Sequence, residues 1–107
     1  MTKALFICGK ARMRSPTAAD VCAQWDGVQT DFAGLSNDAD ERVSTEHLEW
    51  ADIIFVMERR QKTRLTQLFS KELRDKKVIC LNIPDKFDHM QAELVTLIET
   101  KLRKALP

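Results

Sequence analysis

Cys8 and Arg14 are separated by five residues and are followed directly by Ser15 and Pro16. A short apolar run ends at the cysteine, and a helical pattern opens at the serine and proline. This order predicts a thiol and a guanidinium on opposite sides of one tight loop at a helix N-terminus. Backbone N–H groups, the positive end of the helix and a fork-shaped cation together suit a phosphate. The same field favours the thiolate, which is the attacking form of cysteine. We therefore predict a phosphate cradle (residues 8–15) with a nucleophile in its floor.

The same residues also fit a simpler structure, in which a buried core cysteine precedes a solvated basic loop. A second basic run, from Arg59 to Arg64, fits a solvated helix face better than a binding patch. Spacing alone does not distinguish a phosphate cradle from a core cysteine with a solvated loop, so the surrounding elements have to be considered.

The composition indicates one soluble globular domain over residues 1–107, with 44% hydrophobic and 31% charged residues. A net charge of +1 argues against nucleic acid or a membrane surface as partner. The three cysteines, Cys8, Cys22 and Cys80, have neither metal-site nor disulfide spacing, so we expect no metal and no cofactor. The apolar run 4–8 is too short for a signal peptide, and no segment reaches membrane-spanning length. We expect a reducing cytoplasm, and the oligomeric state is not readable.

Short apolar runs alternate with helical patterns, which predicts βαβ units and a parallel sheet. Ser15 is the expected N-cap of the first helix, and Cys22, Leu68 and Cys80 are expected in the core. Ligands of such sheets bind beyond the carboxyl ends of the strands, where the cradle and the loop 82–90 would meet. The expected strands are 4–7, 28–32, 53–57 and 78–81; the expected helices follow residue 15 and cover 45–50, 58–69 and 90–106, with an exposed loop at 34–42 and a short helical piece before residue 76.

Transfer of a phosphoryl group to a thiolate leaves the departing oxygen in need of a proton. Asp85 and Asp88 both lie in the loop after the last strand, and Pro84 restrains the backbone beside Asp85. We expect Asp85 to be the general acid and Asp88 to cap the last helix, although either could hold the acid role. His47 and His89 have no partner pattern and fit surface positions.

At this point the chain resembles the low molecular weight protein tyrosine phosphatases over essentially its whole length. The resemblance implies an α/β fold of three layers, with a four-stranded parallel sheet in the order 2-1-3-4 between helices. It also implies metal-free hydrolysis of phosphomonoesters through a phosphocysteine. The motifs that carry it are Cys8…Arg14-Ser15-Pro16, Ala33-Gly34, the strand from Ala51 to Met57, and Ile83-Pro84-Asp85.

By position, the resemblance makes Cys8 the nucleophile, Arg14 the clamp on the phosphoryl oxygens and Asp85 the general acid. Ser15 would hydrogen-bond the sulfur and help it to leave, and Phe87 would line the pocket entrance. The remaining phosphate-binding and supporting positions are Gly9, Lys10, Ala11, Arg12 and Met13.

The chain departs from the family pattern in the polar network that supports the loop. An asparagine, a serine and a histidine of that network appear as Ala11, Phe32 and Gln61. Lys86 replaces a proline after the acid, and Met13 replaces a second cysteine. Two interpretations stay open: an apolar replacement in which Phe32 packs over Ala11, and a loop that has lost its catalytic geometry.

The leading hypothesis is a phosphatase that acts on phosphotyrosine-like or small aryl phosphates. The alternative is a weak or inactive pseudophosphatase that binds phosphate or a phosphoprotein. Arsenate reduction is a third candidate, disfavoured because it needs further cysteines in the C-terminal half, where only Cys80 lies.

Overall fold

The computed structural model describes residues 1–106 and contains four strands that alternate with four helices. The apolar runs form the strands, and the amphipathic segments between them form the helices, as the alternation predicts. None of the helices in residues 1–106 is both long and apolar enough to cross a membrane. The elements are β1 (Thr2–Cys8), α1 (Arg14–Cys22), β2 (Val28–Gly34), α2 (Thr45–Trp50), β3 (Ile53–Val56), α3 (Arg59–Leu68), β4 (Lys77–Cys80) and α4 (Ala92–Ala105).

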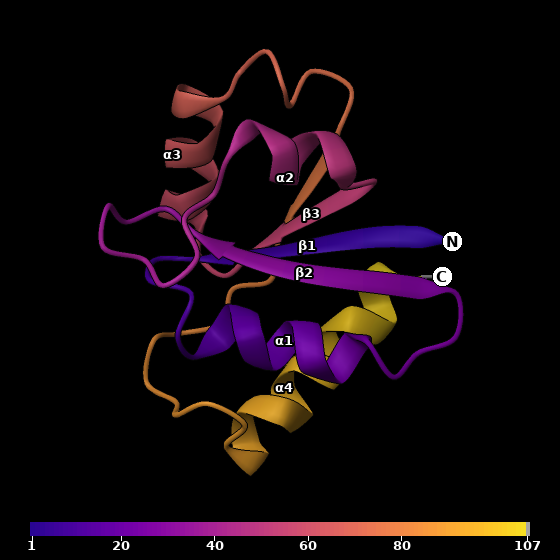
Figure 1. Cartoon of the computed structure of the whole chain (residues 1–107). Helices are drawn as coiled ribbons and strands as arrows, with labels where there is room; N and C mark the ends of the chain where they lie inside the picture. The colour runs from indigo at the N-terminus through magenta and orange to yellow at the C-terminus, as the bar shows by residue number, and fades with distance from the viewer. Residues whose placement is uncertain (107) are drawn as a thin grey trace.

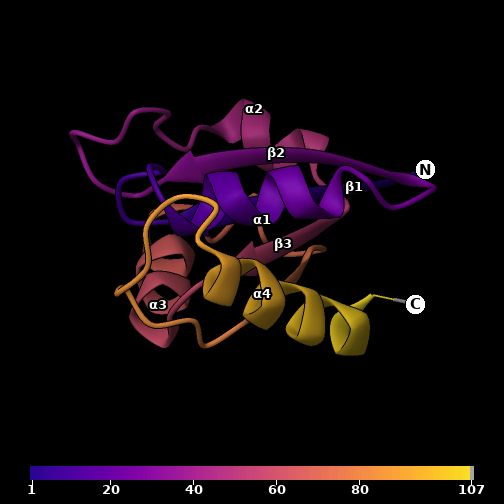
Figure 2. The same ribbon diagram turned by 90° about the horizontal axis from the view of Figure 1, so that it is seen from below.

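The four strands form one parallel sheet in the order β2-β1-β3-β4, so the predicted fold class and strand order are confirmed. Helices α1 and α4 cover one face of the sheet, and α2 and α3 cover the other (Figure 1). Seen from below, α1 and α4 lie side by side across the sheet (Figure 2). The loops after β1, β2 and β4 gather at the carboxyl edge of the sheet, where parallel folds bind ligands.

The central strands are buried on both faces, which explains their continuous apolar character. Towards α1 and α4, the rings of Phe6 and Phe55 stack with their centroids 5.1 Å apart. Towards α2 and α3, Leu5 and Ile54 pack with Leu65. Each fully buried side chain of this size stabilises the fold by about 1.5–3 kcal/mol. The two cores fix β1, and thereby the position of the residue at which it ends, Cys8.

The helix starts differ from those that the sequence predicts. Helix α1 begins at Arg14 with Met13 at the N-cap, so Ser15 lies within the first turn and does not cap it. Its hydroxyl is turned to the Cys8 sulfur, 3.1 Å away. Helix α4 begins at Ala92, two residues later than expected, with Gln91 at the N-cap.

Asp88 does not cap α4, because the helix starts after Gln91. The contact runs the other way: the Gln91 side chain accepts a hydrogen bond from the Asp88 N–H, at 3.0 Å. Residues 70–75 form turns instead of the expected helical piece, and Leu68 is 46% exposed because it lies on the outer side of the last turn of α3. Cys22 is buried as expected, whereas Cys80 is only half-buried because β4 is an edge strand.

Candidate active site

The cradle holds the Cys8 sulfur through two short contacts. The side chain of Cys8 lies at the end of β1 and is only 3% exposed. The Ala11 N–H donates a hydrogen bond to its Sγ at 3.2 Å, and the Ser15 hydroxyl lies 3.1 Å from the same atom. Both groups can donate a hydrogen bond to the sulfur, so the loop surrounds it with donors.

Ala11 has a φ of 59°, which is the left-handed region that L side chains rarely adopt. This conformation is what turns its N–H back towards the sulfur. Such a residue costs about 1 kcal/mol or more, and asparagine tolerates it better than alanine. The asparagine in the family pattern would therefore suit the backbone here, where this chain has alanine.

Arg14 is buried in the first turn of α1, with 4% of its side chain exposed. Its Nη1 donates to Glu58 Oε1 at 2.5 Å and to the carbonyl of Ile83 at 2.8 Å. Its Nε lies 3.8 Å from Asp85 Oδ1. The guanidinium thus links α1 to the residues that follow β3 and β4 at the carboxyl edge of the sheet.

Glu58, which follows β3, supplies the carboxylate opposite Arg14. Burial raises the pKa of Glu58, but hydrogen bonds and charges from Arg14 and Arg60 outweigh it, so the pKa lies below its ordinary value. Arg60 Nε lies 3.0 Å from Glu58 Oε2. The carboxylate is therefore ionised at neutral pH and holds two arginines at the cavity.

The loop after β4 brings Asp85 to the site but not Phe87. Asp85 has a side chain that is 65% exposed and touches the site through Arg14. Phe87 packs against the apolar cluster under α1 and α4, with Lys86 Nζ 5.5 Å from its ring centroid. The ring gains more from apolar contact than from solvent, so the predicted entrance residue does not reach the cavity. Asp88 is exposed in the same loop and does not line the cavity either.

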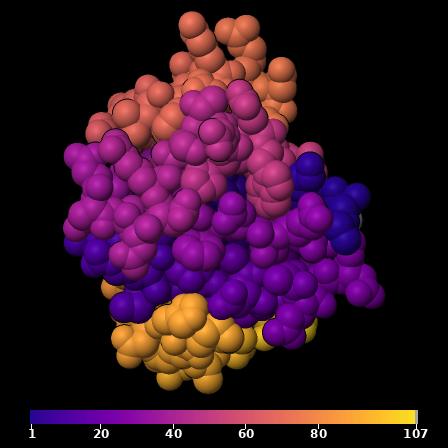
Figure 3. All heavy atoms as spheres, in the orientation of Figure 1, coloured from indigo at the N-terminus to yellow at the C-terminus, as the bar shows by residue number. Residues whose placement is uncertain are grey.

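The cradle backbone is held from outside by the acidic loop (residues 34–42). The N–H groups of Leu35, Ser36 and Asp40 donate to the carbonyls of residues 8, 9 and 10 at 3.0, 2.8 and 3.0 Å. Gly34 makes this approach possible, since a Cβ there would lie 2.6 Å from the Gly9 carbonyl oxygen. The two loops lie directly against each other, magenta against indigo, in Figure 3.

Side-chain pairs reinforce the same contact at the surface. Lys10 Nζ lies 3.1 Å from Asp38 Oδ2, and Arg12 Nε donates to Asp40 Oδ1 at 3.0 Å. The Ser36 hydroxyl also bonds Asp38, and this bond together with Lys10 lowers the pKa of Asp38 to about 2. The hydrogen bond and charge of Asp40 raise the pKa of Arg12.

Gln61 does not reach the cradle backbone, although it stands where the family has a supporting histidine. Its Oε1 accepts hydrogen bonds from the N–H groups of Met57 and Glu58, at 3.0 and 2.9 Å. It therefore orders the start of α3 and, through it, Glu58. Phe32 is packed against the core cluster that includes Phe6, so it supports the sheet. The contacts from the acidic loop take over the support of the cradle.

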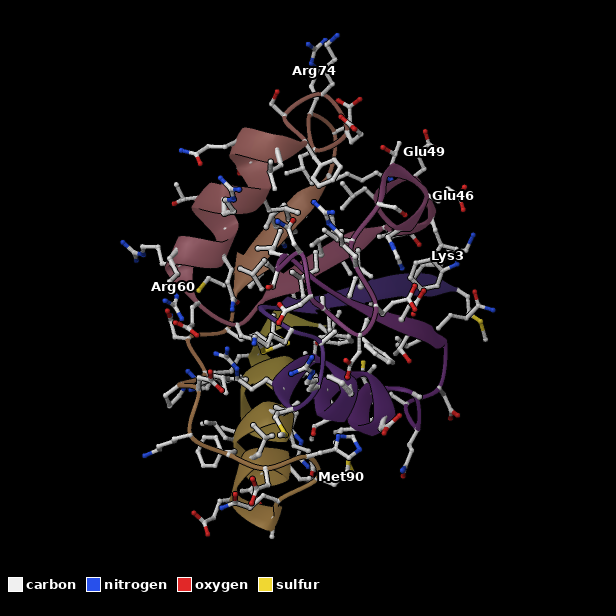
Figure 4. All side chains as sticks on the ribbon, turned by 60° about the vertical axis from the view of Figure 1, so that its left-hand side comes forward. Lys3, Glu46, Glu49, Arg60, Arg74 and Met90 are labelled. Carbon is white, nitrogen blue, oxygen red and sulfur yellow. The ribbon has the colours of Figure 1, made fainter. Side chains whose placement is uncertain are left out.

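The candidate nucleophile, cation and acid converge on one cavity of about 390 Å³. Sequence reasoning missed three of its lining residues, Ser36, Arg60 and Gln61. Arg60, labelled in Figure 4, is the second residue of α3 and is one of the basic residues assigned to a solvated helix face. A larger hollow of about 510 Å³ lies between β4 and α4, but the groups named above do not line it. The cavity is lined by Cys8, Gly9, Lys10, Arg12, Met13, Arg14, Ser36, Arg60, Gln61 and Asp85.

The other two cysteines are outside this cavity. Burial raises the pKa of Cys22 to about 11, so it remains a thiol at neutral pH. Cys80 is half-buried, and its Sγ lies 3.3 Å from Asn82 Oδ1. Within residues 1–106, no three side chains that could hold a metal ion come together.

Together, the sheet order and the loop after β1 define the fold of the low molecular weight protein tyrosine phosphatases. Solved structures with this fold cover nearly the whole chain. The YwlE arginine phosphatase from Geobacillus stearothermophilus is 22% identical, with a TM-score of 0.74 over 99% of this chain and 93% of that one. SP-PTP, a low molecular weight protein tyrosine phosphatase from Streptococcus pyogenes, is 17% identical, with a TM-score of 0.80 over 99% and 91%.

Wzb from Vibrio vulnificus, solved in complex with benzylphosphonate, is 18% identical, with a TM-score of 0.80 over 97% of this chain and 96% of that one. No family model and no curated protein matches the chain. At these identities the likeness establishes the fold, which is the fold that the cradle motif and the strand pattern predict.

Proposed function

We propose that the chain hydrolyses phosphomonoesters through a phosphocysteine formed on Cys8. The observation that carries the proposal is the cradle itself. One sulfur, 3% exposed, accepts contacts from the Ala11 N–H and the Ser15 hydroxyl, and it shares a cavity with Arg14 and Asp85. A core cysteine followed by a solvated loop needs none of these partners, so the plainer interpretation does not explain them.

In the first step, the Cys8 thiolate attacks phosphorus. The S–P bond forms as the P–O bond to the leaving group breaks, and the protonated carboxyl of Asp85 gives its proton to the departing oxygen. Arg14 and the cradle N–H groups stabilise the charge on the equatorial phosphoryl oxygens.

In the second step, the Asp85 carboxylate takes a proton from water as the water oxygen attacks phosphorus. The S–P bond then breaks and releases inorganic phosphate. The returning thiolate is stabilised by the Ser15 hydroxyl and the Ala11 N–H. Glu58 keeps Arg14 aligned throughout, since it is hydrogen-bonded to Nη1.

We propose phosphotyrosine-like or small aryl phosphates as substrates, and the cytoplasm as the place of action. The fold is shared with a protein tyrosine phosphatase and with a protein solved with benzylphosphonate, an aryl-bearing phosphate analogue. It is also shared with an arginine phosphatase, so a phosphoarginine peptide belongs in the first substrate panel.

The direct test measures hydrolysis of 4-nitrophenyl phosphate by the wild type and by Cys8→Ser and Arg14→Ala. We expect both variants to lose activity by at least about 10³-fold, because each removes a group that acts on the phosphoryl centre. Cys80→Ser is the matched control, since it makes the same exchange at a half-buried cysteine outside the cavity. Wild-type activity in Cys8→Ser would rule the mechanism out.

A second candidate is a phosphate-binding pseudophosphatase. It is favoured by one feature: Asp85 is 65% exposed and its only ion pair in residues 1–106 is the 3.8 Å contact with Arg14. A loosely held acid would leave binding intact and slow the chemistry. Vanadate or phosphate binding without turnover would support this candidate, whereas a burst of 4-nitrophenol would exclude it.

A further inference from the structure

Thr17, two residues after the cradle, has a hydroxyl that joins both halves of the proposed site. Thr17 is completely buried in α1. The Oγ1 donates a hydrogen bond to the carbonyl of Met13, at 2.7 Å, and Met13 lines the cavity. The same oxygen accepts a hydrogen bond from the Met90 N–H, at 2.9 Å, at the far end of the loop that carries Asp85.

His89 completes the arrangement, although the sequence assigned it to an unpartnered surface position. Its Nδ1 lies 3.2 Å from Thr17 Oγ1. The single hydroxyl proton of Thr17 is used on the Met13 carbonyl, so Nδ1 must carry the proton and donate it to Oγ1. On the other side of the ring, Nε2 lies 3.8 Å from Oδ2 of Asp20, a residue of α1.

The loop after β4 is therefore fixed at its two ends and not at Asp85. At the near end, the Ile83 N–H donates to the Met57 carbonyl at 2.8 Å, and the Ile83 carbonyl accepts from Arg14. At the far end, Met90 has a φ of 59°, a conformation that turns its N–H to Thr17. Figure 4 shows Met90 at the end of this loop, beside α1.

We propose that Thr17 and His89 form a clasp that positions Asp85 over the cradle. Asp85 is a mostly exposed side chain with one weak contact, so its average position follows from the points at which its loop is held: the two ends and the packed ring of Phe87. The near end is held by the sheet, and the clasp holds the far end. This inference rests on the proposed function for the catalytic role of Asp85. The position of the loop can be tested without turnover.

The first test is amide hydrogen exchange by mass spectrometry on the wild type, Thr17→Val, Thr17→Ser and Thr30→Val. Valine has the shape of threonine without the hydroxyl. Thr30 is the matched control, because its Oγ1 also donates to a carbonyl of α1, that of Ala19, at 3.0 Å. We expect Thr17→Val to exchange about 5- to 10-fold faster over residues 85–88, with the cradle peptide 8–13 unchanged.

Thr17→Ser should restore slow exchange, and Thr30→Val should leave residues 85–88 unchanged. Unaltered exchange over residues 85–88 in Thr17→Val would overturn the clasp. Faster exchange over the whole chain would also overturn it, because the hydroxyl would then support only the fold.

The second test compares two substrates, 4-nitrophenyl phosphate and phenyl phosphate. Phenolate is the more basic leaving group and depends more on a proton from Asp85. We expect Thr17→Val to lose about tenfold more kcat/KM, which reports the step that expels the leaving group, on phenyl phosphate than on 4-nitrophenyl phosphate, and Thr17→Ser to recover it. Equal loss on both substrates would overturn the positioning role. A wild type that hydrolyses neither substrate refutes the proposed function instead. The hydrogen-exchange experiment then still shows whether the clasp exists.

Discussion

Gly34→Ala is the sharpest perturbation of the contact between the cradle and the acidic loop. The added Cβ would lie 2.6 Å from the Gly9 carbonyl oxygen, 2.7 Å from the Ala39 Cβ and 3.1 Å from the Ala11 nitrogen. Two of these atoms are backbone atoms of the cradle and cannot rotate away. Ordinary van der Waals contact starts at 3.4 Å, so the Gly9 carbonyl has to move by about 0.8 Å.

A shift of that size has two measurable consequences. Overpacking of this kind costs about 1–3 kcal/mol, so the thermal midpoint of a 107-residue chain should fall by several degrees. The displaced carbonyl belongs to the loop that carries the Ala11 N–H and the Cys8 sulfur. A misplacement near 1 Å lowers the rate of a positioned reaction by about 10²-fold. We therefore expect kcat/KM on 4-nitrophenyl phosphate to fall by about that factor.

Gly9→Ala is the matched control for stability, because a Cβ at that position meets nothing within 4 Å. Alanine also reduces the conformational freedom of the unfolded chain, so this variant should be neutral or up to about 1 kcal/mol more stable. The measurements are thermal unfolding by circular dichroism and the rise in midpoint that saturating phosphate produces. An unchanged midpoint and phosphate response in Gly34→Ala would refute the close contact on which this reasoning depends.

Three further predictions follow from the charges and thiols of the structure. The hydrogen bond from the Ser36 hydroxyl is the main reason that the pKa of Asp38 is lowered to about 2. The ionised carboxylate therefore stabilises the fold fully above its ordinary pKa of 3.8, and this stabilisation is lost as the pH falls towards 2. The difference in thermal midpoint between the wild type and Asp38→Asn should be constant from pH 7 to about 5 and should decrease at lower pH. Cys22, with a pKa raised to about 11 by burial, should resist iodoacetamide at pH 7.5 until the protein unfolds, as peptide mapping would reveal. Glu58→Gln should lower the free energy of unfolding by about 1–2 kcal/mol, because Arg14 keeps a hydrogen bond but loses its charged partner. Saturating phosphate should reduce that loss of stability. An equal loss with and without phosphate would contradict the role of Glu58 as the partner of Arg14.

The strands and the cradle were accessible from sequence because both are encoded locally, whereas the strand order came from the family resemblance. An apolar run, five residues and an Arg-Ser-Pro sequence specify a strand, a loop and a helix start without reference to the rest of the chain. The nucleophile and the guanidinium lie within this segment. Their convergence on one cavity follows from the geometry of a strand that turns into a helix.

The supporting contacts could not be predicted because they are long-range and use the backbone. The bond from the Asp40 N–H to the Lys10 carbonyl leaves no trace in residue types, and the acidic loop therefore looked like ordinary exposed chain. Arg60 was hidden for a similar reason, since only the fold shows that the start of α3 lies beside Arg14 and lines the cavity. The Asp38 and Asp40 carboxylates carried the available signal, because they can form ion pairs with the basic cradle residues Lys10 and Arg12.

The acidic loop helps to explain how the cradle keeps its shape although Ala11, Phe32 and Gln61 replace the polar network of the family pattern. In the family pattern, a side chain inside the loop holds the turn at position 11, whereas here three backbone bonds hold it from outside. The ion pairs of Lys10 and Arg12 are exposed, so water and salt screen them and they add little. The rigidity of the cradle therefore depends on the backbone bonds and on the absence of a Cβ at Gly34. Coordinated replacement predicts this arrangement, because the loop keeps Ala11 in a strained conformation with its N–H aimed at the sulfur.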